Sequence, residues 1–297
     1  MKNILFAALW LVSLPCHAAL NVFACEPEWA ALTQQLAGDK TSIYTATSAL
    51  QDPHHIEARP SLIAKARRAN LVICTGAGLE AAWLPLVLRE SGNRAIQPGS
   101  DGYFEASSVV QMLEIPTRLD RGDGDVHALG NPHIQTDARN FLPIADALIK
   151  RLIQLDPANT LYYRQQIAAF KQRWHAAINR WEEQAAPLQG VAFVAQHQGF
   201  PYLSRWLGLR QVATLEAKPG IEPSAAHLGK ILADLQQRPA RMVLRAAYQS
   251  DRPAAWIAER AKIPVVTLPY TVGGSSQASD LFTLFDDTIQ HLLAGLK

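Results

Sequence analysis

Beyond its first residues, the chain lacks any apolar segment long enough to cross a membrane, and it carries little excess charge of either sign. No stretch after residue 18 approaches the roughly 20 apolar residues that a membrane helix needs. The formal net charge is +2, and it falls to +1 if Lys2 is removed with a cleaved leader. Neither value is typical of proteins that bind nucleic acid or anionic lipid surfaces. We therefore expect no nucleic-acid partner and no membrane-spanning domain.

The first 18 residues have the organisation of an export signal. Lys2 supplies a positive charge, residues 4–14 form a short apolar core, and Cys16-His17-Ala18 places small residues where a signal peptidase cuts. The apolar core is short for a membrane span, and Pro15 before Cys16 argues against a lipoprotein signal, which needs a small residue there. We expect cleavage near Ala18 and a soluble mature protein in the periplasm.

Cysteine is scarce, with three residues in the whole chain. Cys16 lies in the predicted leader, which leaves Cys25 and Cys74. Both fall at predicted strands that can be neighbours in one parallel sheet. An exported protein folds in an oxidising compartment, where disulfides persist. The two residues form either a disulfide or a pair of buried thiols, and intact mass with and without reductant distinguishes the two states.

Short apolar runs alternate with longer amphipathic ones, which is typical of β-α units built around parallel sheets. The predicted strands cover residues 20–24, 41–45, 71–74, 191–195, 241–245 and 264–268, and the predicted helices cover residues 27–37, 60–69, 81–90, 136–155, 160–184 and 279–296. Residues 96–131 are rich in Gly, Asp, Ser and Pro, with a loop expected at residues 120–125. No internal repeat is visible. The pattern predicts an α/β fold.

The helix predicted at residues 160–184 determines the domain organisation. It contains no Gly or Pro, and about 25 residues at 1.5 Å each extend nearly 40 Å, enough to span two lobes. We expect an N-terminal α/β lobe at residues 19–156, a single linker helix at residues 157–187 and a C-terminal α/β lobe at residues 188–297. Each lobe is expected to be a mostly parallel sheet flanked by helices.

Four residues with metal-binding side chains are spaced widely and almost evenly along the chain: His54, His133, His197 and Asp280. The histidines occur in turn-rich segments near strand ends, namely Asp52-Pro53-His54, Gly130-Asn131-Pro132-His133 and Gln196-His197-Gln198-Gly199-Phe200. Two-lobed α/β proteins present their ligand sites at such positions. Three neutral imidazoles and a carboxylate complete a four-coordinate site for a borderline ion such as zinc. With two ligands in each half of the chain, the metal would lie between the lobes.

The spacing of these residues argues against a metalloprotease. They are separated by 79, 64 and 83 positions, and the chain contains no His-Glu-x-x-His motif. Two other histidines are close to the candidates in sequence. His55 adjoins His54, and neighbours in an extended segment point to opposite faces, so only one of them is expected to reach the ion. His127 is expected to be solvated in its loop, from which it can capture metal transiently.

Four segments resemble one family. These are residues 52–61 with residues 69–80, then Gly130-Asn131-Pro132-His133, and then residues 196–202. They look like the first, second and third ligand segments of the zinc and manganese substrate-binding proteins of ABC transporters. The resemblance covers nearly the whole mature chain. It implies two α/β lobes joined by one rigid helix, a metal held in the cleft between them, and delivery of that metal to a membrane permease.

The resemblance also assigns the ligands. It makes His54 rather than His55 the first ligand, and His133 and His197 the next two. Members of the family often have Asp just after the last strand, but the corresponding stretch of this chain has no carboxylate. Asp280, just beyond it, is therefore the nearest candidate for the fourth position.

Two departures bear on which metal is bound. Many zinc members carry a long loop rich in His and acidic residues before the second ligand, whereas this chain has only residues 120–127, with one histidine. Manganese members place Glu where this chain has His197. Three nitrogen donors favour zinc over the harder manganese ion. We therefore predict a monomeric periplasmic protein, not an enzyme, that carries Zn²⁺ to an ABC permease, with a periplasmic metallochaperone as a further candidate partner.

Two alternative functions fit the same sequence. A binding protein for a chelate such as haem or a siderophore would need an open aromatic cleft, for which the candidates are Trp83, Tyr103, Trp206 and Tyr270. A zinc hydrolase would use Glu57 or Asp52 as a base beside an open metal position. Bound chelate in the purified protein would favour the first alternative, and ester hydrolysis lost in His133→Ala would favour the second.

Overall fold

The structure is a computed structural model that describes residues 19–118 and 124–297. The predicted export signal at residues 1–18, and residues 120–123 of the predicted loop, lie outside the described residues. The N-terminal half contains β1 (Leu20–Ala24), β2 (Thr41–Thr45), β3 (Leu71–Cys74), β4 (Tyr103–Glu105), α1 (Pro27–Ala37), α2 (Pro60–Arg67), α3 (Leu84–Ser91) and α4 (Phe141–Leu155). The long helix α5 (Thr160–Ala185) follows. The C-terminal half contains β5 (Ala192–Ala195), β6 (Arg210–Thr214), β7 (Met242–Ala246), β8 (Val265–Leu268), α6 (Pro201–Leu207), α7 (Ala225–Gln237), α8 (Arg252–Ala261) and α9 (Leu281–Ala294).

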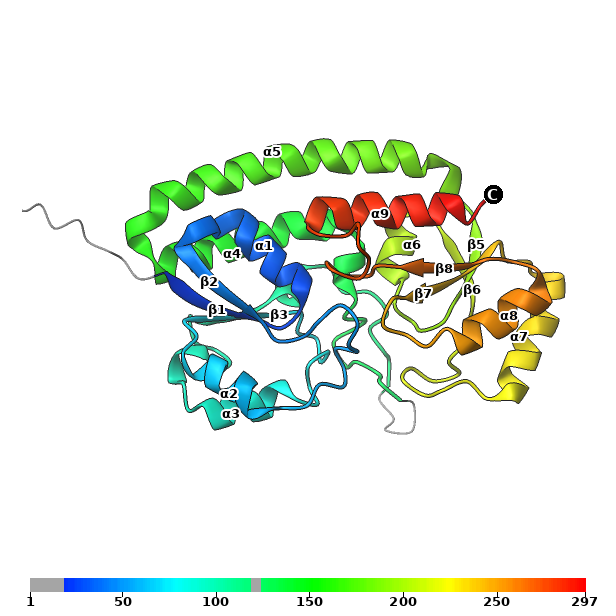
Figure 1. Cartoon of the computed structure of the whole chain (residues 1–297), viewed down its shortest axis with the longest axis horizontal. Helices are drawn as coiled ribbons and strands as arrows, with labels where there is room; N and C mark the ends of the chain where they lie inside the picture. Colours follow the sequence, from blue (N-terminus) through cyan, green and yellow to red (C-terminus); the bar gives the residue numbers. More distant parts are fainter. Residues whose placement is uncertain (1–18, 119–123) are drawn as a thin grey trace, which may run out of the picture.

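Each lobe is built on a four-stranded parallel sheet flanked by helices (Figure 1). The N-terminal sheet has the strand order β2-β1-β3-β4, and the C-terminal sheet has the order β6-β5-β7-β8. The two orders coincide when β5 to β8 are matched in turn to β1 to β4. The lobes thus repeat a topology although the sequence shows no repeat, and the predicted α/β class with two parallel sheets and a helix between them is confirmed.

The end of β1 alternates between two hydrophobic cores. Val22 and Ala24 belong to a core shared with α1 and α4, whereas Phe23 and the following Cys25 belong to a second core with α2 and α3. A parallel strand covered by helices on both faces needs apolar side chains at every position. The disulfide between Cys25 and Cys74 joins the ends of β1 and β3, with a Cα–Cα distance of 4.8 Å.

The helix α5 runs along both lobes in Figure 1 and carries one hydrophobic core from one to the other. Trp174, near its middle, is fully buried. Its ring lies 5.4 Å from that of Phe141 in α4 and 5.7 Å from that of Phe285 in α9. A wide hinge motion would expose this shared core to water at a large free-energy cost. The packing therefore favours small relative movements of the lobes.

In the described part of the chain, no helix is both long enough and apolar enough to cross a membrane.

The fold carries the three candidate histidines on segments that lead out of the two sheets. His54 lies in the loop after β2, and His197 lies in the loop directly after β5. His133 lies in the long connection between β4 and α4. Two of the three thus follow the carboxyl ends of parallel strands, where α/β proteins place their ligand sites.

Candidate metal site

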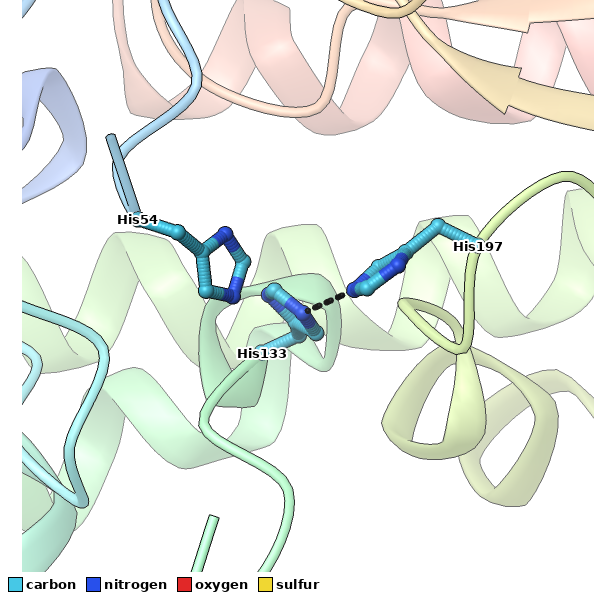
Figure 2. A group of neighbouring side chains, drawn as sticks. All are labelled: His54, His133 and His197. Atoms are coloured by element: carbon cyan, nitrogen blue, oxygen red, sulfur yellow. Dashed lines mark hydrogen bonds between the residues drawn. The ribbon is translucent and has the colours of Figure 1, made fainter. Parts of the chain in front are cut away.

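The structure brings His54, His133 and His197 together (Figure 2). One ring nitrogen of each lies within 4.8 Å of the corresponding nitrogens of the other two. The ring centroids are 5.2 to 5.6 Å apart, and all three side chains are buried. Three imidazoles from three distant segments therefore converge on one point, as a metal site requires.

The ring nitrogens at this point are poorly satisfied by the protein itself. The Nε2 atoms of His133 and His197 lie 3.1 Å apart. Nε2 of His54 and Nδ1 of His133 are buried and have no hydrogen-bond partner among the described residues. Buried polar atoms without partners are rare in folded proteins because each costs free energy. A bound cation with nitrogen ligands would satisfy the inward-facing nitrogens.

Two carboxylates orient two of the rings. Oδ1 of Asp52 lies 2.7 Å from Nδ1 of His54, and Oε2 of Glu216 lies 2.8 Å from Nδ1 of His197. A proton on Nδ1 shared with a carboxylate leaves the lone pair of Nε2 free for a metal and raises the basicity of the ring. Sequence reasoning considered Asp52 only as a hydrolase base and did not find Glu216, which is 19 residues from His197.

The buried environment keeps the imidazole of His133 neutral. Burial, together with the neighbouring rings of His197, His54 and His127, lowers the pKa of His133 well below its usual value. Burial raises the pKa of Asp52, but its hydrogen bond with His54 and the charge of that ring lower the pKa more, so that the net shift is downward. Neutral imidazole is the form that binds metal. His133 is therefore in the form that binds a cation at neutral pH.

His127 lies closer to the site than its loop position suggested. It was expected to be solvated, but it is only partly exposed, and its ring centroid is 5.3 Å from that of His54. Its Nε2 is buried without a hydrogen-bond partner among the described residues. Burial, followed by the charge of His54, lowers the pKa of His127 to about 4. The neutral imidazole of His127 thus borders the three rings that converge.

The structure does not bring Asp280 to the three histidines. Asp280 is the N-cap of α9, where Oδ1 accepts a hydrogen bond from the backbone N of Thr283 at 2.9 Å. In return the backbone N of Asp280 donates to Oγ1 of Thr283 at 2.9 Å, which completes a capping box. The nearer residue is Tyr270, directly after β8, whose ring centroid lies 5.7 Å from that of His133. The assignment of Asp280 as a ligand stays a prediction.

The residues singled out for the alternative functions mostly have other contacts. Nε1 of Trp83 donates to the backbone O of Pro53 at 3.0 Å, and Nε1 of Trp206 donates to Glu182 at 3.0 Å. The hydroxyl of Tyr103 donates to Glu105 at 2.7 Å. Glu57, a candidate base, is exposed. Tyr270 is the member of the aromatic set whose ring approaches the histidines.

Comparison with known proteins gives consistent matches over nearly the whole chain. The profile of the family described as zinc-uptake complex component A, periplasmic (ZnuA) matches residues 22–295. The manganese ABC transporter substrate-binding lipoprotein PsaA of Streptococcus pneumoniae is 23% identical over 258 residues, which cover 85% of this chain and 80% of PsaA. The metal ABC transporter substrate-binding lipoprotein SloC of Streptococcus mutans is 22% identical over 312 residues, which cover 97% of this chain and 99% of SloC. A crystal structure of ZnuA superposes with a TM-score of 0.77 at 21% identity, covering 94% of this chain and 100% of that one, which establishes a shared fold.

Proposed function

We propose, from the premise that this chain belongs to the zinc-uptake complex component A family, that its cargo is Zn²⁺. Members of this family are substrate-binding proteins of metal ABC transporters and not enzymes. Such proteins work with a membrane permease. The question specific to this chain is therefore which ion it carries and which side chains hold that ion.

The observation that supports zinc is the all-nitrogen character of the convergent group. Its described members are His54, His133 and His197. Zinc is commonly bound by imidazole nitrogen, whereas manganese prefers harder oxygen donors. The named relatives do not decide the matter, because PsaA is named for manganese and SloC for metal in general. The support for zinc therefore comes from the donor atoms of this chain.

For the fourth donor we favour His127 over the predicted Asp280. Nε2 of His127 is buried without a partner among the described residues, and its ring lies beside His54. The carboxylate of Asp280 already accepts a hydrogen bond from the first turn of α9. As a ligand, His127 would also cover the metal with a segment that belongs to neither sheet. Four nitrogen donors would match the tetrahedral preference of zinc.

We extend the proposal to the cellular location of the protein and the source of its zinc. Residues 1–18 would be removed near Ala18, and the mature protein would act as a monomer in the periplasm. There it would receive zinc directly or from a periplasmic metallochaperone. The apolar core flanked by Lys2 and small residues supports the export signal.

The first test is competitive binding of Zn²⁺ and Mn²⁺ to the mature protein, beside His133→Ala and His197→Ala. We expect one zinc per chain, tighter binding of zinc than of manganese, and a loss of about 100-fold or more in each variant. His175→Ala is the matched control, because His175 is an exposed residue of α5. Tighter binding of manganese, or unchanged zinc binding in both site variants, would contradict the proposal.

A second pair of variants decides the fourth ligand. His127→Ala should weaken zinc binding by about 10- to 100-fold. Asp280→Ser should leave zinc affinity unchanged, because serine still caps the helix while the carboxylate is gone. The reverse pattern, with loss in Asp280→Ser and none in His127→Ala, would restore Asp280 as the ligand.

A further inference from the structure

Glu216 connects a candidate ligand to a turn on the surface of the C-terminal lobe. Its Oε2 lies 2.8 Å from Nδ1 of His197 and accepts a hydrogen bond from the backbone N of Gly220, also at 2.8 Å. The side chain is only 15% exposed. One carboxylate oxygen therefore holds both the imidazole and residues 216–221, which we call the C-lobe turn.

The C-lobe turn touches a segment that belongs to the N-terminal half of the chain. Residues 124–127, which we call the crossing segment, end at His127 beside His54. The backbone N of Asp125 donates to the backbone O of Pro219 at 2.9 Å. Oδ2 of Asp125 lies 3.5 Å from Nε2 of His55, the neighbour of His54. The two segments thus join the lobes next to the histidines.

Two glycines allow this close approach. Gly124 has φ 81° and Gly220 has φ 75°. A Cβ at Gly124 would overlap the backbone O of Pro219, and a Cβ at Gly220 would overlap the carboxylate of Asp125. Gly190 has an almost identical φ of 76°, yet a Cβ there would meet nothing within 4 Å. At Gly124 and Gly220 the missing side chain therefore serves the contact between segments as well as the left-handed backbone.

We propose that Glu216 is a positioning residue that couples metal binding at His197 to the contact between the C-lobe turn and the crossing segment. The proposal rests on the function as a metal carrier given above. Because Oε2 of Glu216 serves both Nδ1 of His197 and the amide of Gly220, displacing the turn removes part of what orients the imidazole. The contact therefore slows the release of bound metal, and a partner that separates the two segments would speed it.

The steric test compares Gly220→Ala with Gly190→Ala. Both variants place a side chain at a positive φ and bear the same backbone strain. Only the first clashes with Asp125. We expect the rate of zinc release into an excess of chelator to rise about 10-fold in Gly220→Ala, as for loss of a hydrogen bond to a charged group. Release from Gly190→Ala should match the unmodified protein. An equal effect in both variants would overturn the proposal, since strain alone would explain it.

The electrostatic test uses Glu216→Ala and Glu216→Gln. We expect the release rate to rise about 10- to 100-fold in Glu216→Ala, and less in Glu216→Gln, whose amide oxygen can still accept one hydrogen bond. The association rate should change little. Unchanged release in both Glu216→Ala and Gly220→Ala would overturn the proposal.

A readout that needs no metal separates this proposal from the choice of zinc as cargo. Hydrogen exchange of the Asp125 amide, measured by NMR on the metal-free protein, reports its bond to Pro219. Protection of this amide should fall in Glu216→Ala and Gly220→Ala but not in Gly190→Ala. If the protein bound no zinc, this pattern would still support the contact between the segments. Unchanged protection in all variants would overturn it.

Discussion

In the N-terminal lobe the ends of β1 and β3 are joined by Cys25 and Cys74. The matching positions of the C-terminal lobe are Gln196, directly after β5, and Arg245, within β7. The registers make these positions equivalent, since Ala24 pairs with Ile73 and Ala195 pairs with Leu244. Cys25 is followed by Glu26 in one lobe, and Gln196 is followed by His197 in the other. One topological position therefore holds a buried carboxyl group in one lobe and a candidate metal ligand in the other.

Glu26 is part of a buried carboxyl cluster that the C-terminal lobe does not repeat at this position. Glu26 accepts hydrogen bonds from the backbone N and the hydroxyl of Thr75, and Glu80 accepts from the backbone N of Thr75 and of Gly76. Burial, followed by the charges of Glu80 and Glu28, raises the pKa of Glu26 well above its ordinary value. The shared strand order thus places Glu26 and His197 at equivalent ends of the two sheets. The chemistry of each side chain then determines whether the position supports the fold or can bind a metal.

Of the changes to the two lobes, removal of the disulfide between Cys25 and Cys74 should lower the stability of the protein most. The double variant Cys25→Ala with Cys74→Ala should lose about 2–5 kcal/mol of unfolding free energy. The bond closes a loop between residues 49 positions apart, which restricts the unfolded chain. Urea unfolding under oxidising conditions measures the loss. The reduced unmodified protein is the control and should be destabilised similarly. A double variant as stable as the oxidised protein would contradict a structural role for the disulfide.

The buried carboxyl groups should make stability depend on pH. Glu28, in the first turn of α1, bonds to the hydroxyl of Thr271 after β8. Burial, only partly opposed by that hydrogen bond, raises the pKa of Glu28 from 4.5 to about 7. The folded state then holds a proton that the unfolded chain releases between these two pH values. The free energy of unfolding should therefore fall as pH rises from 4.5 to about 7.

Glu28→Gln tests this linkage, because glutamine cannot ionise but can still bond to Thr271. The variant should flatten the pH dependence by up to about 1.4 kcal/mol per pH unit, measured by urea unfolding at several pH values between 4.5 and 7. Glu222→Gln is the control, since Glu222 is exposed. The same slope in Glu28→Gln and in the unmodified protein would show that Glu28 ionises normally in the fold.

The smallest effect is expected at the start of α9. Asp280→Ala should cost about 1 kcal/mol of stability, because the first turn of the helix loses its cap. Asp280→Ser should stay near the unmodified value, since a serine hydroxyl also caps helices. Thermal unfolding of the metal-free proteins measures both. Equal stability of the alanine variant and the unmodified protein would show that the Asp280 cap does not stabilise the fold.

Six strands and the long helix could be predicted, whereas β4 and β6 could not. β1, β2 and β3 have the predicted limits, and α5 ends at Ala185, one residue beyond the predicted end. β4 has only three residues, and most of β6 is half-buried, so neither shows a strong apolar pattern. Both lie at sheet edges, but so do β2 and β8, which were predicted. The weak apolar pattern of β4 and β6, rather than their edge position, therefore explains why they were missed.

The sequence predicted those site residues that lie in recognisable local segments. The turn-rich segments before His54, His133 and His197 indicated candidate ligands, and these three side chains converge. The spacing of Asp280 and Thr283 was also a local signal, for a helix cap rather than a ligand. Glu216 had no such signal, because it reaches His197 from a segment 19 residues further along the chain. His127 was considered only for transient capture of metal, because no local pattern shows that its loop folds against His54.

Local sequence patterns were enough to define most strands and the long helix, because apolar periodicity and helix-breaking residues act within a few neighbours. They also narrowed the ligands to a few histidines in strand-end contexts. Long-range packing, in contrast, determines which side chains converge on one point, which carboxylates orient them, and where the crossing segment meets the C-lobe turn. These contacts depend on how the two sheets are held by the core along α5, and no pattern within a short window encodes the relative position of two sheets.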